Sequence, residues 1–183
     1  LTPQNKIKVD SNLKVCLLKQ PIEPQLKTVM VAAPHPDDAS IGCGGTLARL
    51  KAEGHSLIFV SMTTGHRADI PQTTQDERVA LRQAEAEAEA NIFNSPCVSL
   101  ALNFYENSYI PSSEDILRTI AFLEKHRPDI IFSASTKDRH PAHSYSAKIL
   151  KESIHQLKDV YTPELWFYEG PWFLFGRDDF NVV

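Results

Sequence analysis

The sequence has few cysteines and no long apolar run. Its three cysteines, Cys16, Cys43 and Cys97, are widely spaced and odd in number, so they predict neither a disulfide framework nor a C-x-x-C zinc pair. Such sparse cysteine usage indicates a reducing compartment, and we expect the cytoplasm. No apolar stretch approaches the roughly 18 residues of a membrane-spanning helix, and no signal-peptide pattern opens the chain. We therefore expect no membrane span.

The chain also lacks a dense run of positive charge. It carries 19 Lys and Arg against 23 Asp and Glu, a net charge of −4. This balance argues against nucleic acid or an anionic membrane as the main partner. The chain contains neither a dinucleotide-binding glycine fingerprint nor a P-loop, which disfavours hydride and phosphoryl transfer. Its 183 residues, 42% of them hydrophobic, are typical of one globular domain.

Apolar runs alternate with helix-forming segments along the chain. We predict strands at residues 28–33, 56–62, 98–102, 129–133 and 165–168. We predict helices at residues 46–53, 76–94, from a cap at 112 or 113 to 125, and 143–157, the first of them after a tight glycine turn. This alternation is typical of an α/β, Rossmann-like three-layer fold with a mostly parallel sheet. Residues 1–26 are predicted to form an N-terminal arm or edge element, and residues 27–183 the main domain.

Polar segments directly follow two of the predicted strands. They read Pro34-His35-Pro36-Asp37-Asp38 and Asp138-Arg139-His140-Pro141-Ala142-His143. Parallel strands end at one edge of a sheet, and open α/β sheets place their sites at that edge, next to a topological switch point. Each segment also spaces two ligand-type side chains three residues apart, so that both can face one ion. Because catalytic zinc commonly takes three His or carboxylate ligands, we predict a zinc site at this edge that activates a water.

The remaining polar side chains of the two segments suit a hydrolytic reaction. Asp37 can take the proton of a metal-activated water, and His140 can assist an oxyanion that builds on an amide carbonyl. The plainer interpretation is that each segment is only a proline-rich turn followed by a helix cap. Two such segments, each directly after an apolar strand, favour the metal site over that interpretation.

These segments resemble the motifs of the N-acetylglucosaminyl-phosphatidylinositol, mycothiol and bacillithiol de-N-acetylases, the LmbE-like or PIG-L-like family. The resemblance spans residues 27–157. Its further matching motifs are Gly42-Cys43-Gly44-Gly45-Thr46-Leu47-Ala48-Arg49-Leu50, Gly54, Met62-Thr63-Thr64-Gly65, Arg82 with Glu85, and Arg127-Pro128-Asp129.

The resemblance implies a zinc-dependent hydrolase that removes acetyl from an N-acetylglucosamine-type amino sugar or glycoconjugate. It implies that His35, Asp38 and His143 are the metal ligands. Two His and one Asp would accept zinc or ferrous iron. It implies that Asp37 is the general base and that His140 stabilises the oxyanion or protonates the amine.

Two arginines are predicted to bind substrate. The resemblance places Arg82 near the sugar or a phosphate, although an ion pair with Glu85 is the plainer alternative. Arg67 follows the strand at 56–62 with His66, at the same edge of the sheet. Weaker similarity points to a subgroup in which this domain follows a glucosamine-6-phosphate deaminase-like domain. We therefore expect either that fused partner or a homo-oligomer.

Two positions depart from the family pattern. Ala39 stands where an acidic residue is usual, and Ala142 stands in place of the Asp of a His-Pro-Asp-His motif. A carboxylate there would hold the His140 ring, and Asp138 is the nearest substitute. The departures motivate a second hypothesis, a catalytically weak, metal-containing sugar-binding or regulatory domain. A third is a metal-dependent hydrolase of a different bond.

Overall fold

The fold is described for residues 25–171 and 173–175 of a computed structural model; the predicted arm lies almost wholly outside these residues. The strands, all of them parallel neighbours, form one sheet in the order β3-β2-β1-β4-β5. Their bounds are Thr28–Ala33 for β1, Ser56–Ser61 for β2, Cys97–Ser99 for β3, Ile130–Ala134 for β4 and Glu164–Tyr168 for β5. The sheet is thus wholly parallel rather than mostly so.

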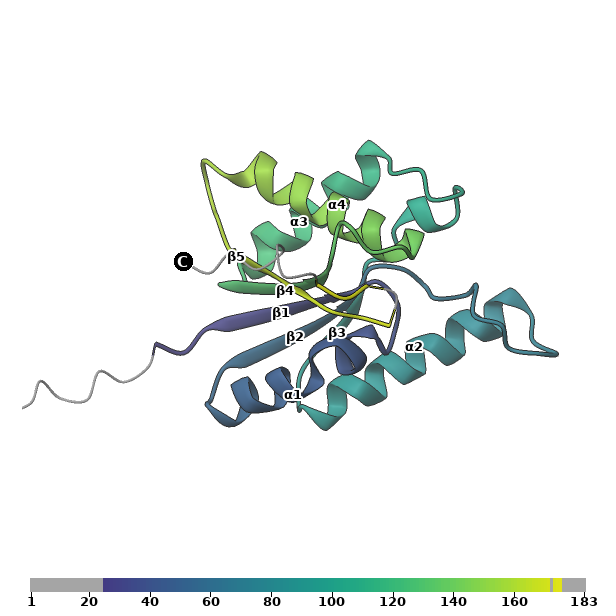
Figure 1. The fold of residues 1–183 in the computed structure, drawn as a ribbon, viewed down its shortest axis with the longest axis horizontal. Coiled ribbons are helices and arrows are strands. Elements are labelled where there is room, and N and C mark those ends of the chain that lie inside the picture. The colour runs from purple at the N-terminus through teal and green to yellow at the C-terminus, as the bar shows by residue number, and fades with distance from the viewer. Residues whose placement is uncertain (1–24, 172, 176–183) are drawn as a thin grey trace, which may run out of the picture.

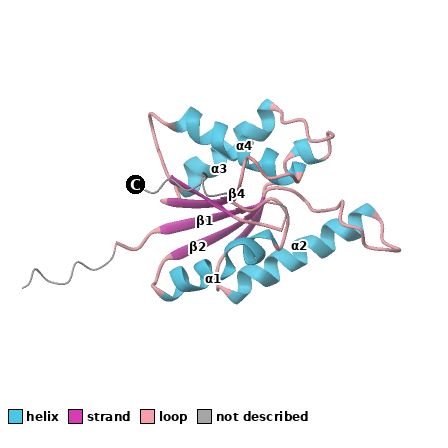
Figure 2. Ribbon diagram, viewed as in Figure 1, coloured by secondary structure: helices cyan, strands magenta, loops and turns pink. Residues whose placement is uncertain are grey.

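Helices cover both faces of the sheet, which confirms the three-layer prediction (Figure 1). One layer consists of α1 (Asp38–Ala52) and α2 (Gln75–Ile92), and the other of α3 (Ser113–His126) and α4 (Pro141–Leu157). A short 3₁₀ helix, η1 (Asn103–Tyr105), follows β3. Figure 2 shows the long loops gathered at one end of the strands.

The central strands β1, β2 and β4 are buried on both faces, and this explains why they are continuous apolar runs rather than alternating ones. Within β1, Met30 and Ala32 belong to the apolar cluster on one face, with Leu123 of α3. Val31 belongs to the cluster on the other face, with Leu47 of α1. Successive side chains of a strand point to opposite faces, so β1 contributes to both cores. Full burial of such residues contributes on the order of 1.5–3 kcal/mol each.

Two of the helices begin with the reciprocal capping arrangement that their sequences encode. The side chains of Thr74 and Ser112 each accept a hydrogen bond from the main-chain N–H of the third helical residue, Glu77 and Asp115. The carboxylates of Glu77 and Asp115 in turn accept one from the main-chain N–H of Thr74 and Ser112. The start of α4 lies earlier than predicted, because Pro141 occupies its first turn and His140 its N-cap.

The predicted turn at the glycines after β1 is wrong. The α1 helix begins at Asp38 and continues through the glycines, with a local break at Cys43 (φ −145°, ψ 17°). The reason is packing: a Cβ on Gly42 would lie 2.2 Å from Cδ2 of the Tyr168 ring. Gly42 therefore lets α1 approach β5 closely, rather than turning the chain.

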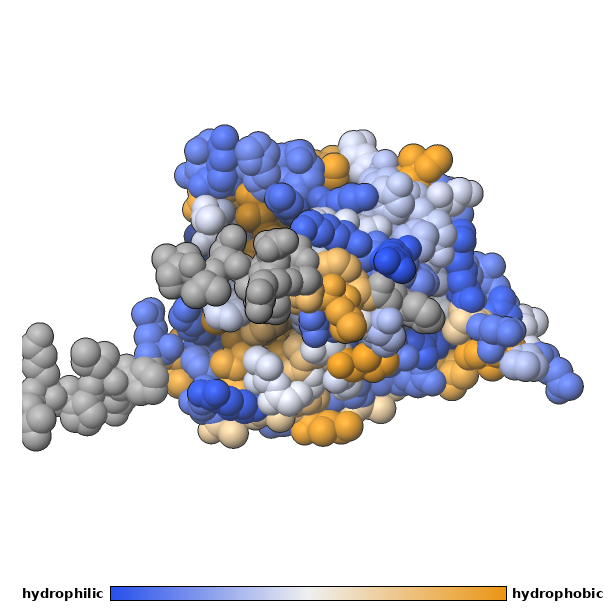
Figure 3. All heavy atoms as spheres, viewed as in Figure 1, coloured by the Kyte–Doolittle hydropathy of each residue, from blue (hydrophilic) through white to orange (hydrophobic). Residues whose placement is uncertain are grey.

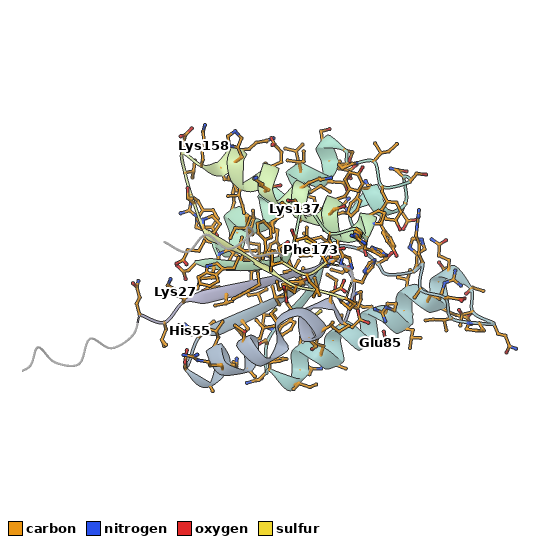
Figure 4. The ribbon with its side chains drawn as sticks, in the orientation of Figure 1. Lys27, His55, Glu85, Lys137, Lys158 and Phe173 are labelled. Atoms are coloured by element: carbon orange, nitrogen blue, oxygen red, sulfur yellow. The ribbon has the colours of Figure 1, made fainter. Side chains whose placement is uncertain are left out.

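The strand order places the topological switch point between β1 and β4. In Figure 4, Lys27 and His55 mark the amino-terminal end of the strands, while Lys137 lies beyond the carboxyl end of β4.

None of the helices in the described part of the chain is long and apolar enough to cross a membrane. Apolar side chains gather near the middle of the face of the molecule that Figure 3 shows. On β5, Trp166 is 54% exposed, so the sheet's outer strand is incompletely covered.

Candidate active site

The loop after β1 holds His35 and Asp38 against each other. Oδ2 of Asp38 accepts a hydrogen bond from the main-chain N–H of His35 (2.8 Å) and lies 3.1 Å from its ring Nδ1. Between them Asp37 adopts a left-handed backbone conformation, with φ 97°. A non-glycine residue in such a region costs on the order of 1–3 kcal/mol, so the surrounding structure holds this turn.

The N-cap and first turn of α4, after β4, bring two further imidazoles to the same place. Nε2 of His143 lies 3.3 Å from Oδ2 of Asp38, the same oxygen that faces His35. The rings of His140 and His143 are neighbours, with centroids 4.6 Å apart, and the His35 and His140 centroids are 5.0 Å apart. The predicted convergence of the two segments is therefore present in the structure.

The carboxylate of Asp138, which the sequence suggested as support for the His140 ring, contacts the ring of His143 and the main-chain N–H of His140. Its Oδ2 lies 3.0 Å from Nδ1 of His143, and its Oδ1 accepts a hydrogen bond from the main-chain N–H of His140 (2.8 Å). We assign the Nδ1 proton of His143 to this contact, which leaves Nε2 directed at Asp38. This is the carboxylate–histidine arrangement that commonly orients a metal-bound imidazole.

The donor set fits a divalent metal. Ligands about 2.0–2.2 Å from a tetrahedral zinc lie roughly 3.3 Å from one another, and Asp38 lies 3.1 Å from His35 and 3.3 Å from His143. Ring nitrogens of His35, His140 and His143 also lie within 4.8 Å of one another. Two sets of metal ligands are therefore possible: His35 and His143 with Asp38, or the imidazoles of His35, His140 and His143.

Charge within the cluster is unevenly shared. Burial raises the pKa of Asp38, but hydrogen bonds from His143 and His35 outweigh burial and hold it well below its usual range. Burial lowers the pKa of His143, but Asp38 and Asp138 outweigh burial and raise it. For His140, burial and the neighbouring imidazoles lower the pKa, against the opposing effect of both carboxylates. Asp38 is therefore the fixed negative charge of the cluster.

A cavity of about 430 Å³ opens over these residues. Every residue predicted for the site lines it: His35, Asp37, Asp38, Arg67, Arg82, His140 and His143. Six further residues that were not among the predicted site residues also line the cavity: Ile41, Gly65, Ala68, Tyr105, Tyr109 and Pro171. Tyr105 and Tyr109 follow β3, so the rule that sites gather at the carboxyl edge of a parallel sheet was a usable signal for them.

The two tyrosines form a shelf under Arg67. The Arg67 guanidinium carbon lies 5.2 Å from the Tyr105 ring centroid and 4.8 Å from that of Tyr109, which is cation–π distance. Burial raises the pKa of Tyr105 to about 12, so its phenol stays protonated at neutral pH. His66 is buried, pairs with Glu106 (3.1 Å) and does not line the cavity.

Arg82 reaches the loop after β1 from the middle of α2. Its Nη2 lies 3.1 Å from Oδ1 of Asp37, and its Nη1 donates to Oε2 of Glu85 (2.5 Å). The ion pair with Glu85 that was the plainer prediction is therefore present, but it is only part of the arrangement. Asp37 itself stays half exposed to the cavity, with 51% of its side-chain surface accessible.

A family model, GlcNAc-PI de-N-acetylase (PIG-L), matches residues 30–154, which include both histidine segments. The chain belongs to the PIG-L family. This confirms the resemblance drawn from the motifs. The match includes α1, α2, α3, most of α4 and the switch point at which the site lies.

Named relatives and solved structures agree with membership of the PIG-L family. The diacetylchitobiose deacetylase of Thermococcus kodakarensis is 26% identical over 70% of this chain and 49% of its own length. The N,N'-diacetylchitobiose deacetylase of Pyrococcus horikoshii superposes with a TM-score of 0.67 at 25% identity, covering 80% of this chain and 62% of that one. The conserved protein TT1542 of Thermus thermophilus has a TM-score of 0.66 at 30% identity, covering 82% and 69%. This chain thus spans about half of the curated Thermococcus relative.

Proposed function

We propose that this PIG-L domain is a metal-dependent N-deacetylase acting on an N-acetylglucosamine-type amino sugar or a glycoconjugate that carries one. The observation that supports the proposal is that the imidazoles of His35 and His143 both face Oδ2 of Asp38, and that all three residues line one cavity. The named deacetylases among the relatives support the reaction class. We propose the cytoplasm as the compartment. Zinc and ferrous iron are the metals that two imidazoles and one carboxylate suit.

Of the two donor sets, we propose His35, Asp38 and His143 as the ligands. A carboxylate offsets the charge of a divalent ion, which a third neutral imidazole does not. The Oδ2 of Asp38 already lies near a tetrahedral ligand–ligand distance from both imidazoles. A metal bound there supplies Lewis acidity, polarising the acetyl carbonyl and making a water more acidic.

The protein's own groups then carry the protons. Asp37, exposed in the cavity, accepts a proton from the water as the water oxygen attacks the acetyl carbon. His140 donates a ring N–H to the carbonyl oxygen as negative charge builds on it, a role that a neutral imidazole can fill. The C–N bond breaks, and the proton held by Asp37 passes to the amine nitrogen. The acetyl group leaves as acetic acid, which ionises in water to acetate and a proton, and the free amine leaves with it.

The rim of the cavity suits a sugar-sized substrate. We propose that Arg67 and Arg82 hold the substrate side of the site, since both line the cavity. Arg67 is exposed on its tyrosine shelf, and the described residues place no carboxylate within 4.0 Å of its guanidinium. Its Nη2 donates one hydrogen bond to the main-chain carbonyl of Glu106 (3.5 Å). The remaining N–H groups are available to hydroxyl, carboxylate or phosphate oxygens of a ligand.

The proposal is tested by acetate release from a panel of N-acetylated amino sugars, including N-acetylglucosamine and diacetylchitobiose, with zinc or ferrous iron supplied. The wild type should release acetate, and Asp37→Ala should keep its metal while losing turnover. Asp76→Ala, which removes an exposed carboxylate from the first turn of α2, is the matched control. Binding without acetate release from any member would favour the catalytically weak sugar-binding domain instead. An Asp37→Ala protein with unchanged turnover would refute the role of Asp37.

A further inference from the structure

One positive charge on the rim of the cavity has no carboxylate beside it. Within the described ranges, the guanidinium of Arg67 has a single acceptor, the main-chain carbonyl of Glu106 at 3.5 Å. The carboxylate of Glu106 instead faces the ring of His66 at 3.1 Å. Arg67 is exposed where it lines the cavity. Its remaining N–H groups and its charge are therefore open to a ligand.

The other charges of the cavity wall are already shared. Asp37 and Asp38 are the only carboxylates among the described residues that line it. Arg82 keeps its proposed contact with substrate, but its guanidinium is also paired with Asp37 (3.1 Å) and Glu85 (2.5 Å). In the described lining, Arg67 is therefore the arginine that no carboxylate approaches within 4.0 Å. A positive charge left in this way favours an anion on the ligand.

Two tyrosines hold the Arg67 guanidinium in place before a ligand arrives. Its central carbon lies 5.2 Å from the ring centroid of Tyr105 and 4.8 Å from that of Tyr109. Tyr105 is only 2% exposed, so its ring is fixed by packing. A guanidinium that rests on fixed rings loses less side-chain freedom when a ligand binds. Its planar fork can then meet two oxygens of one phosphate or carboxylate.

The main chain that carries Arg67 is held as well. The carbonyl of the preceding residue accepts a hydrogen bond from Nε of Arg78 in α2 (2.6 Å). Earlier in the same loop, the hydroxyl of Thr63 donates to the carbonyl of Pro34 (2.7 Å), which directly precedes His35. The loops after β1 and β2 are thus tied together, and Arg67 is held at a set distance from the histidine cluster.

That distance suits a single sugar unit. The ring centroids of His35 and Tyr105 are 5.6 Å apart, and the Arg67 guanidinium lies 5.2 Å from the same Tyr105 centroid. The guanidinium therefore lies no farther from the His35 ring than these two distances combined, which is the reach of one sugar with one substituent. With the acetamide at the histidine cluster, an anionic group on the same sugar can reach Arg67.

We propose that Arg67 and its tyrosine shelf form a subsite for an anionic group, a phosphate or a carboxylate, carried by the N-acetylated amino sugar. This rests on the proposed function, and it narrows the substrate class from amino sugars in general to acidic ones. Two of the relatives are named for diacetylchitobiose. That disaccharide carries no anionic group, so it would leave this subsite unused.

The test compares kcat/KM for acetate release from matched sugars. N-acetylglucosamine is the neutral reference, its 1-phosphate and 6-phosphate carry phosphate at opposite ends, and N-acetylmuramic acid carries a carboxylate. In the wild type we expect at least one anionic sugar to exceed the reference about 10- to 100-fold, the scale of a hydrogen bond to a charged group. In Arg67→Ala we expect this ratio to fall to about 3-fold or less.

Two further variants show what the ratio depends on. Arg49→Ala also removes one positive charge, but from a surface arginine that pairs with Glu53 outside the cavity lining, and it should keep the wild-type ratio. Arg67→Lys keeps the charge without the planar fork, so we expect a ratio between those of the wild type and Arg67→Ala. A wild-type ratio retained in Arg67→Ala would overturn the subsite. Equal or higher kcat/KM for the neutral sugar in the wild type would overturn it too, while acetate release would still support the proposed function.

Binding of the deacetylated sugars gives a readout that needs no turnover. Titration calorimetry compares glucosamine with its 1-phosphate, its 6-phosphate and muramic acid, on the wild type and on Arg67→Ala. We expect the best anionic sugar to bind the wild type about 10- to 100-fold more tightly than glucosamine. This advantage should shrink in added potassium chloride and disappear in Arg67→Ala. That pattern without acetate release from any sugar would contradict the proposed function and support the subsite, whereas equal binding of all four sugars would overturn the subsite.

Discussion

Oδ2 of Asp38 lies 3.3 Å from Nε2 of His143, although the two residues come from loops after different strands. Asp38 opens α1 after β1, and His143 lies in the first turn of α4 after β4. They meet because β1 and β4 are parallel neighbours on either side of the switch point. The same oxygen faces His35 at 3.1 Å. One carboxylate therefore links both histidine segments.

The two possible donor sets predict opposite results for a pair of substitutions. If Asp38 is a ligand, Asp38→Asn should lower zinc affinity more than 100-fold, on the scale of losing a charged ligand, while His140→Ala should keep its zinc. Titration calorimetry and elemental analysis of the purified proteins measure both. Zinc retained in Asp38→Asn and lost in His140→Ala would select the set of three imidazoles.

Asp138→Asn tests the support of His143. The amide keeps the shape of the side chain but removes the negative charge that accepts the Nδ1 proton of His143. Loss of such support typically costs about 10- to 100-fold in metal affinity, and we expect a fall of this size. Asp76→Asn, at an exposed position of α2, is the control and should bind zinc like the wild type. An unchanged zinc affinity in Asp138→Asn would show that the contact does not tune His143.

His66 gives a pH dependence of stability. Burial lowers its pKa in the folded protein, against the raising effect of Glu106 and together with the charges of Arg67 and Arg78. The unfolded chain, with a histidine pKa of about 6.5, then binds the proton more readily than the folded one. The contribution of His66 is therefore complete above pH 6.5 and declines as the pH falls through its lower folded pKa.

Urea unfolding at pH 7.5 and at pH 5 measures this contribution. We expect the wild type to lose more stability between the two pH values than His66→Gln, which has no ionisable group at that position. His126 and His140 also have lowered pKa values, but they are common to both proteins and cancel in the difference. Equal losses in the two proteins would mean that His66 titrates alike in the folded and unfolded chains.

Two glycines of α1 should respond in opposite directions to alanine. A Cβ on Gly42 would meet the Tyr168 ring at 2.2 Å, whereas nothing lies within 4 Å of one on Gly45. We expect Gly42→Ala to destabilise the protein by about 1–3 kcal/mol through overpacking. Gly45→Ala should stabilise it by about 0.5–1 kcal/mol through helix propensity. Thermal unfolding compares the two, and similar shifts would argue against the contact between α1 and β5.

Strands and ligand segments were predictable because they depend on local patterns. The apolar run of β1 ends at Pro34, and that of β4 ends shortly before Asp138, so the sheet-edge rule brought both histidine segments together. A helix cap at Ser112 or Ser113 was also predicted from local sequence, and the structure places it at Ser112, with Asp115 completing a capping box. The predicted strand at 98–102 was less accurate, because β3 is only Cys97–Ser99.

The rest depended on contacts between distant residues. The start of α1 was missed because residues 38–45 have poor helix propensity, and it is Tyr168 packing on Gly42 that explains the glycine. The contact of Arg82 with Asp37 crosses from α2 to the loop after β1. No local spacing encodes it, whereas the pair of Arg82 and Glu85 lies within one helix. Tyr105 ends η1 and Tyr109 follows it; the sheet-edge rule places this segment near the site, but no sequence motif identifies the two tyrosines as cavity residues.

Anomalous diffraction from crystals grown with zinc, recorded on both sides of the zinc absorption edge, tests the central claim most directly. The account predicts one strong zinc peak bonded to Nδ1 of His35, Oδ2 of Asp38 and Nε2 of His143, with Asp37 and His140 beside it and not bonded to it. A peak that excludes Asp38, or crystals that bind no zinc or ferrous iron at this cluster, would contradict the account.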